Sequence, residues 1–203
     1  MSSFVYYSYY VLGYIPNLFN QSGDIMISSI NSICKETSIP YPLYKSMIGK
    51  YFIGQTELLP VNSNSLLVAL VNPSHSNVNI FLNVATITSL KTIGLVEFYL
   101  GSNLCQGICS NLVKCTNTNF DNCPKGLIKY LEPAIIPNNA TSIFTRYITN
   151  PGTEIIDGGQ IILAPGKSFY VYMSDSNYPL TNLSIRVAFG WWEDNKVCCN
   201  SMY

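Results

Sequence analysis

The sequence predicts an all-β protein, a jelly-roll-like β-sandwich of about eight or nine strands preceded by an N-terminal arm with a short helix. Beyond Lys50, runs of apolar and β-branched residues are separated by turn residues about every eight to twelve positions. Within 95–100 and 183–189 apolar and polar side chains alternate, which is the period of a half-buried strand. Because no long helical pattern separates the runs, a sandwich of antiparallel strands is favoured.

The pattern divides the chain into segments of different character. Residues 1–45 are predicted to form a connector between subunits, and residues 46–194 the sandwich, with a cysteine-rich insertion at 101–126. Residues 195–203 form a C-terminal tail.

Tyrosine is concentrated at the start of the arm, at Tyr6, Tyr7, Tyr9, Tyr10 and Tyr14. Aromatic segments that are apolar on both sides suit an extended conformation with both faces buried. The segment is therefore a candidate strand lodged between subunits. The alternative is an arm folded onto its own domain.

A short amphipathic helix is predicted over 24–37, because apolar residues recur there at three- and four-residue spacing. Asp24 can cap its start, and Pro40 can stop the segment. Cys34 falls on the apolar side of this helix.

The strands follow in order after Lys50. The predicted strands are 51–59, 66–71, 78–89, 95–100, 127–131, 143–148, 155–156, 160–163, 168–173 and 183–192. The turns between them include Asn62-Ser63-Asn64, Asn72-Pro73, Asp157-Gly158-Gly159 and Pro165-Gly166. Period and composition indicate the strands but not their order in the sheets.

The composition favours burial in an assembly. Only 11% of residues are charged and 48% are hydrophobic, so much of the surface must be uncharged. The eleven basic and eleven acidic residues balance. This argues against a nucleic-acid partner and against an anionic membrane surface.

The apolar N-terminus lacks the basic leading region and the small-residue cleavage site of a signal peptide. Gly13 and Pro16 interrupt it, so it is also too short for a membrane span. We expect synthesis in a cytosol, where thiols stay reduced, with oxidation after release.

Four of the seven cysteines, Cys105, Cys109, Cys115 and Cys123, lie in the polar insertion. Two local disulfides that pin the insertion are the favoured interpretation, with a connectivity that the sequence does not give. A tetrathiolate zinc site is the alternative, although only the first spacing suits zinc. Free or intersubunit thiols are a third.

Cys34 and the vicinal pair Cys198 and Cys199 are candidates for disulfides between subunits. An odd number of cysteines cannot be closed within one chain. Disulfides from the tail of one subunit to the arm or insertion of another would join neighbours without straining the core. The alternative is a buried helical cysteine and a reduced tail.

No pattern for catalysis stands out, and we expect neither an enzyme nor a cofactor. The sole histidine, His75, lies in a turn-forming stretch. Gly166-Lys167-Ser168 resembles the end of a phosphate loop, but a strand follows it. Glu193-Asp194 is the only adjacent carboxylate pair, and a glycosidase would need two carboxylates that face each other across a cleft.

Trp191 and Trp192 follow the last strand pattern and are candidate interface residues. They could form a platform for stacking on sugars. More often, one such tryptophan caps the core and the other meets a neighbouring subunit.

Three blocks carry a resemblance to an uncharacterised family of endospore-forming Firmicutes: YFIGQT at 51–56, LVNPSHSNVNIFLNV at 70–84 and RVAFGWWE at 186–193. The plan also resembles that of the endospore appendage (Ena-type) pilins, in which a jelly roll carries a flexible N-terminal connector and cysteines join successive subunits. That resemblance implies synthesis in the mother cell and later oxidation at the spore surface. Their paired cysteines lie in the connector, whereas here the pair is C-terminal.

Together these features favour a self-assembling structural subunit of an extracellular or spore-surface fibre, with an anchoring protein on the spore surface as a possible further partner. The arm would dock onto a neighbour, giving a head-to-tail homopolymer that does not close on itself. The alternative is a trimeric jelly-roll module, displayed on a surface, that binds a glycan or a receptor.

Overall fold

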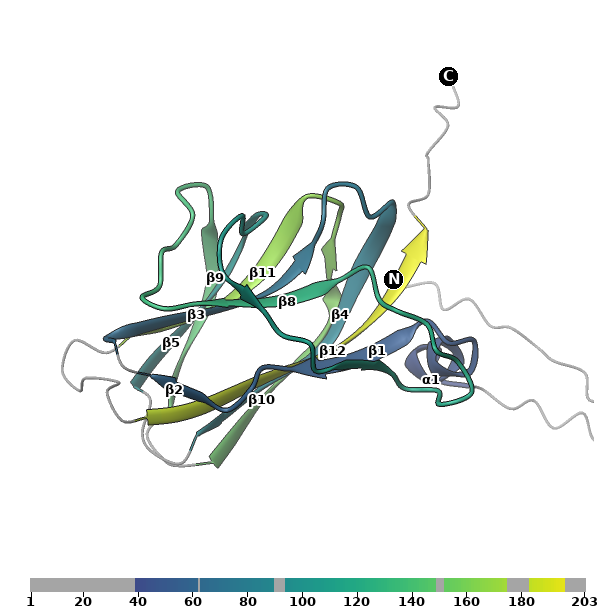
Figure 1. The fold of residues 1–203 in the computed structure, drawn as a ribbon, viewed down its shortest axis with the longest axis horizontal. Coiled ribbons are helices and arrows are strands. Elements are labelled where there is room, and N and C mark those ends of the chain that lie inside the picture. Colours follow the sequence, from purple (N-terminus) through teal and green to yellow (C-terminus); the bar gives the residue numbers. More distant parts are fainter. Residues whose placement is uncertain (1–38, 62, 90–93, 149–151, 175–182, 196–203) are drawn as a thin grey trace, which may run out of the picture. The chain divides into compact units, whose positions relative to one another are not determined.

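The computed structural model describes residues 39–61, 63–89, 94–148, 152–174 and 183–195. The described strands belong to one compact unit that begins at Tyr41. They form two antiparallel sheets packed face to face (Figure 1). The predicted all-β sandwich is confirmed. In the described part of the chain no helix is long and apolar enough to cross a membrane.

The first sheet has the order β10-β4-β12-β1-β7, and β2 pairs with β12 beside this path. Its strands are β1 (Tyr51–Gln55), β2 (Leu59–Val61), β4 (Val78–Ser89), β7 (Val113–Cys115), β10 (Gly152–Leu163) and β12 (Leu183–Asn195).

The second sheet has the order β6-β8-β3-β11-β5-β9. Its strands are β3 (Ser65–Asn72), β5 (Gly94–Ser102), β6 (Ile108–Cys109), β8 (Leu127–Leu131), β9 (Thr141–Ile148) and β11 (Lys167–Ser174).

Eight of these strands make a jelly roll. From β3 to β5, and again from β9 to β12, each strand lies in the opposite sheet to the strand before it in the chain. The eight strands therefore form two four-stranded sheets with the orders β10-β4-β12-β1 and β3-β11-β5-β9. The insertion after β5 supplies β6 and β7, and β8 follows it directly. Because β8 pairs with β3 and β7 pairs with β1, this stretch widens both sheets on the same side of the roll.

Most predicted strands are present, and two of the sequence interpretations are wrong. The predicted turn at Asp157-Gly158-Gly159 is a shift of register inside the continuous strand β10, between Asp157 and Ile161. A glycine pair can serve a bulge as well as a turn, so the local sequence does not separate the two. The predicted run 51–59 is divided into β1 and β2.

One short helix, α1 (Tyr41–Met47), precedes β1. Pro42 is tolerated in its first turn. Its end is closed by two hydrogen bonds, from the Lys50 N–H to the Lys45 carbonyl and from the Gly49 N–H to the Ser46 carbonyl. Gly49 permits this closure with a φ of 69°. The helix predicted over 24–37 lies outside the described residues.

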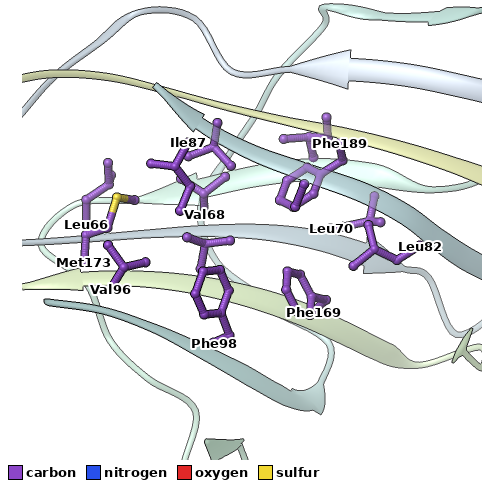
Figure 2. Close-up of a cluster of buried hydrophobic side chains, with 14 of the residues drawn as sticks. Leu66, Val68, Leu70, Leu82, Ile87, Val96, Phe98, Phe169, Met173 and Phe189 are labelled. Atoms are coloured by element: carbon purple, nitrogen blue, oxygen red, sulfur yellow. The ribbon is translucent and has the colours of Figure 1, made fainter. Parts of the chain in front are cut away.

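The core lies between the sheets, where side chains from both layers interdigitate (Figure 2). Leu66, Val68 and Leu70 of β3 point into it. The intervening residues Leu67 and Ala69 are buried on the outer face of the second sheet, in a smaller cluster with Leu104 and Tyr170. Burial on both faces explains why β3 reads as a continuous apolar run rather than an alternating one.

Candidate functional site

The outer face of the first sheet carries an aromatic cluster, which consists of Tyr41, Tyr51, Phe81 and Trp192. The Trp192 indole stacks on Phe81 with ring centroids 5.3 Å apart and an interplanar angle of 6°. Tyr51 stacks on the same indole at 6.4 Å, and Tyr41 of α1 meets it edge-on at 5.6 Å. The helix therefore covers one end of this face.

An ion pair holds α1 in place. Lys45 Nζ lies 2.5 Å from Asp194 Oδ1, and the two side chains are 6% and 24% exposed. The Tyr41 hydroxyl donates to Asp194 Oδ2 at 3.3 Å. Burial by itself would lower the pKa of Lys45, but the bonds to Asp194 and Tyr41 outweigh it and raise that pKa above its ordinary value.

We expect Lys45→Met to lower the free energy of unfolding by about 1–3 kcal/mol at neutral pH. This loss is smaller than the ~3–5 kcal/mol that removal of one partner of a fully buried ion pair costs, because Asp194 is partly exposed. A raised folded-state pKa means that this stabilisation is complete below the unfolded pKa of about 10.4 and is lost as the pH rises through the folded value. Urea unfolding should therefore show a constant gap between the unfolding free energies of wild type and variant up to about pH 10, and a narrowing gap above that pH. Lys50→Met, at an exposed position, is the matched control. An equal loss in the control would contradict the role of the ion pair.

A groove of about 510 Å³ continues this face beyond the aromatic cluster. Its floor is formed by Ala188 and Gly190 of β12 with Val84 and Thr86 of β4. These residues point outward, because the neighbouring Val187, Phe189 and Ala85 are in the core.

The walls of the groove come from Ile53 of β1 and from residues 111–114 at β7. Ile53 is 51% exposed, and Leu112 is also exposed. Gly190 keeps the floor low, since a Cβ there would lie 2.7 Å from the Tyr51 hydroxyl and 2.8 Å from Val84 Cγ1. The groove is thus an apolar recess that the described part of this chain leaves uncovered.

Glu193 ties the insertion to the sheet. Its buried carboxylate accepts hydrogen bonds from the N–H groups of Lys125 and Gly126 at 2.8–3.0 Å and from Trp191 Nε1 at 3.1 Å. The adjacent Asp194 is engaged with Lys45. Both carboxylates of the pair that the sequence singles out therefore make structural contacts.

Two of the four cysteines of the insertion lie in strands of different sheets, and the other two lie in loops. Cys109 lies in β6 of the second sheet and Cys115 in β7 of the first, while Cys105 and Cys123 are exposed in the connecting loops. All four are free thiols in the structure. Within the described ranges, no three side chains of His, Cys, Asp or Glu gather as a metal site would require. The predicted local disulfides stay a prediction.

Both tryptophans are enclosed by this chain's own side chains. Trp191 is fully buried in the core against Phe52, at 6.0 Å between ring centroids. Trp192 is 6% exposed beneath Tyr41, so neither indole presents an open face to a sugar. His75 is exposed in the turn between β3 and β4.

The arm and tail candidates, Tyr6, Tyr7, Tyr9, Tyr10, Tyr14, Cys34, Cys198 and Cys199, lie outside the described residues. The sequence interpretation did not find the groove, the Glu193 contacts or helix α1. For α1 a signal was present, since proline near the start and glycine just past the end mark a helix.

Comparison with known proteins gives a family and no named relative. One protein-family model matches residues 25–199, which include α1 and every strand of the sandwich. No curated protein matches the chain, and no solved structure matches it.

Proposed function

The chain belongs to a family of unknown function (DUF6143). We propose that it is a structural subunit that polymerises with copies of itself. The observation that carries this proposal is the outer face of the first sheet. Helix α1 covers one end of that face, and the other end is an apolar groove lined by exposed Ile53 and Leu112. Uncovered apolar surface of this kind is typical of contact sites between proteins.

The positions at which the connectors join the domain also support assembly. Tyr41, next to the arm, contacts Asp194, next to the tail. Cys34 precedes the first of these residues by seven positions, and Cys198 and Cys199 follow the second within five. Arm and tail therefore join the domain side by side, and the thiols proposed to link subunits are carried on both.

In the proposed polymer, each arm docks onto the domain of the next subunit, and disulfides through Cys34, Cys198 or Cys199 lock the contact. Such a head-to-tail contact propagates as a fibre because it does not close on itself. The resemblance to endospore appendage pilins agrees with this plan and suggests a spore-surface location after synthesis in the mother cell. No catalytic step is part of the proposal.

Non-reducing gel electrophoresis of the air-oxidised full-length protein is expected to show a ladder of oligomers that collapses to monomer with dithiothreitol. The double variant Cys198→Ser/Cys199→Ser should lose most of the ladder, because its tail can no longer form a disulfide. Cys123→Ser, an exposed cysteine of the insertion, is the matched control and should keep it. Negative-stain electron microscopy should show fibres. Uniform trimers would instead support a surface-display module, and monomer with and without reductant would remove the cross-links.

A further inference from the structure

The chemistry of the groove indicates what it binds. Its lining is mostly apolar, and Lys114 is its only charged side chain. Asn111 and Gln55 add polar groups that can hydrogen-bond a hydroxyl. At about 510 Å³ it lies within the usual range of ligand pockets, about 300–1,000 Å³, and is large enough for more than one aromatic ring. Its occupant should therefore be uncharged and apolar, with polar tips.

The start of this chain has that chemistry. No charged side chain occurs before Asp24, and residues 4–15 contain Phe4 and five tyrosines. A tyrosine places an apolar ring against a surface while its hydroxyl reaches a polar partner. Rings in the recess could thus bring hydroxyls to Asn111, Gln55 or Lys114.

We propose that the groove binds residues 4–15 of a neighbouring copy of the chain. The proposal rests on the proposed function and names the surface that receives the arm. The same face already accepts a tyrosine from this chain, since Tyr41 packs edge-on against Trp192. The aromatic cluster adjoins the groove at Tyr51, whose hydroxyl lies close to Gly190 of the groove floor. Arm tyrosines would extend this aromatic layer over the open end of the face.

The arm is long enough to reach another subunit. With the helix predicted over 24–37 at about 1.5 Å per residue and the other residues extended, the segment from residue 15 to Tyr41 can span up to about 60 Å. A domain of this size has a radius of gyration of only about 15 Å. The arm can therefore leave its own domain and reach the groove of the next one.

A photo-crosslinking experiment tests the occupant. Benzoylphenylalanine is placed at Leu112 in the full-length chain, and light and ¹⁵N-labelled copies are mixed before assembly and irradiation. We expect mass spectrometry to find crosslinks between position 112 of one isotopic form and arm peptides of the other. Crosslinks within one isotopic form alone would show that the groove holds its own arm, and crosslinks that avoid the arm would show another occupant. Either result overturns the proposal.

A pair of matched variants tests the consequence for assembly. Ile53 in the groove and Ile162 of β10 are both exposed isoleucines on the outer face of the first sheet, at 51% and 56%. Ile53→Asp is expected to raise the protein concentration needed for fibre formation by about tenfold, which corresponds to about 1.4 kcal/mol. Ile162→Asp should leave it within a factor of about two.

Circular dichroism and thermal unfolding should confirm that both variants fold. Fibres that form equally well with Ile53→Asp would overturn the groove assignment and leave the proposed function standing. Wild-type protein that forms no fibres would remove the proposed function and this assignment with it.

Discussion

Removal of residues 2–20 is expected to abolish fibre formation while leaving a folded, monomeric domain. The buried side chains that form the core of the described sandwich lie between Phe52 and Trp191, and the deletion retains all of them. The deletion removes the Tyr-rich segment that we propose to dock on the next subunit. Light scattering after size exclusion should report a monomer, and the midpoint of thermal unfolding should change by no more than a few degrees.

A full-length variant separates the role of the tyrosines from that of arm length. Serine at positions 6, 7, 9, 10 and 14 preserves the length and the lack of charge but removes the aromatic rings. We expect this variant to lose fibres as the truncation does, because the apolar groove gains little from serine side chains. Fibres formed by the truncated chain would show that assembly uses another surface.

Glu193→Ala is expected to lower the free energy of unfolding by about 4 kcal/mol, and Glu193→Gln by about 2 kcal/mol. Alanine leaves three donors without their acceptor: the buried N–H of Gly126, the buried indole N–H of Trp191 and the partly buried N–H of Lys125. Glutamine keeps one acceptor oxygen, but its amide nitrogen would face the Lys125 N–H, which already donates to both carboxylate oxygens.

Urea unfolding measures both losses. Glu57→Gln, at an exposed position beyond β1, is the control and should change stability by less than about 0.5 kcal/mol. The Glu193 variants should also expose the half-buried Cys115 thiol of β7 to labelling reagents more readily, since the insertion would be less firmly attached. Unfolding energies equal to that of the control would contradict a structural role for this carboxylate.

The strands were predictable where burial alternates or where turn residues bracket an apolar run. Val78–Ser89 and Leu127–Leu131 have the predicted bounds. The short strands β6 and β7 were not predictable, because they lie in a polar stretch and exist through pairing with β8 and β1. Strand pairing is a tertiary contact, and local composition carries little information about it.

The candidate site was less predictable than the fold because its parts are distant in sequence. Lys45 and Asp194 are separated by 149 positions, and Glu193 lies 68 positions from Lys125. The groove joins Ile53 to Leu112 across the first sheet. Which residues share an outer face follows from strand order, and the sequence pattern does not supply that order.

The attachment of both connectors at one corner has a mechanical consequence for a fibre under tension. The start of β1 and the end of β12 are partners, with Tyr51 opposite Trp192. A pull between arm and tail would therefore load first the Lys45–Asp194 ion pair and the last residues of β12, which pair with β1 on one side and with β4 on the other. In the proposed fibre, this corner would have to open before the force reached the strands farther away.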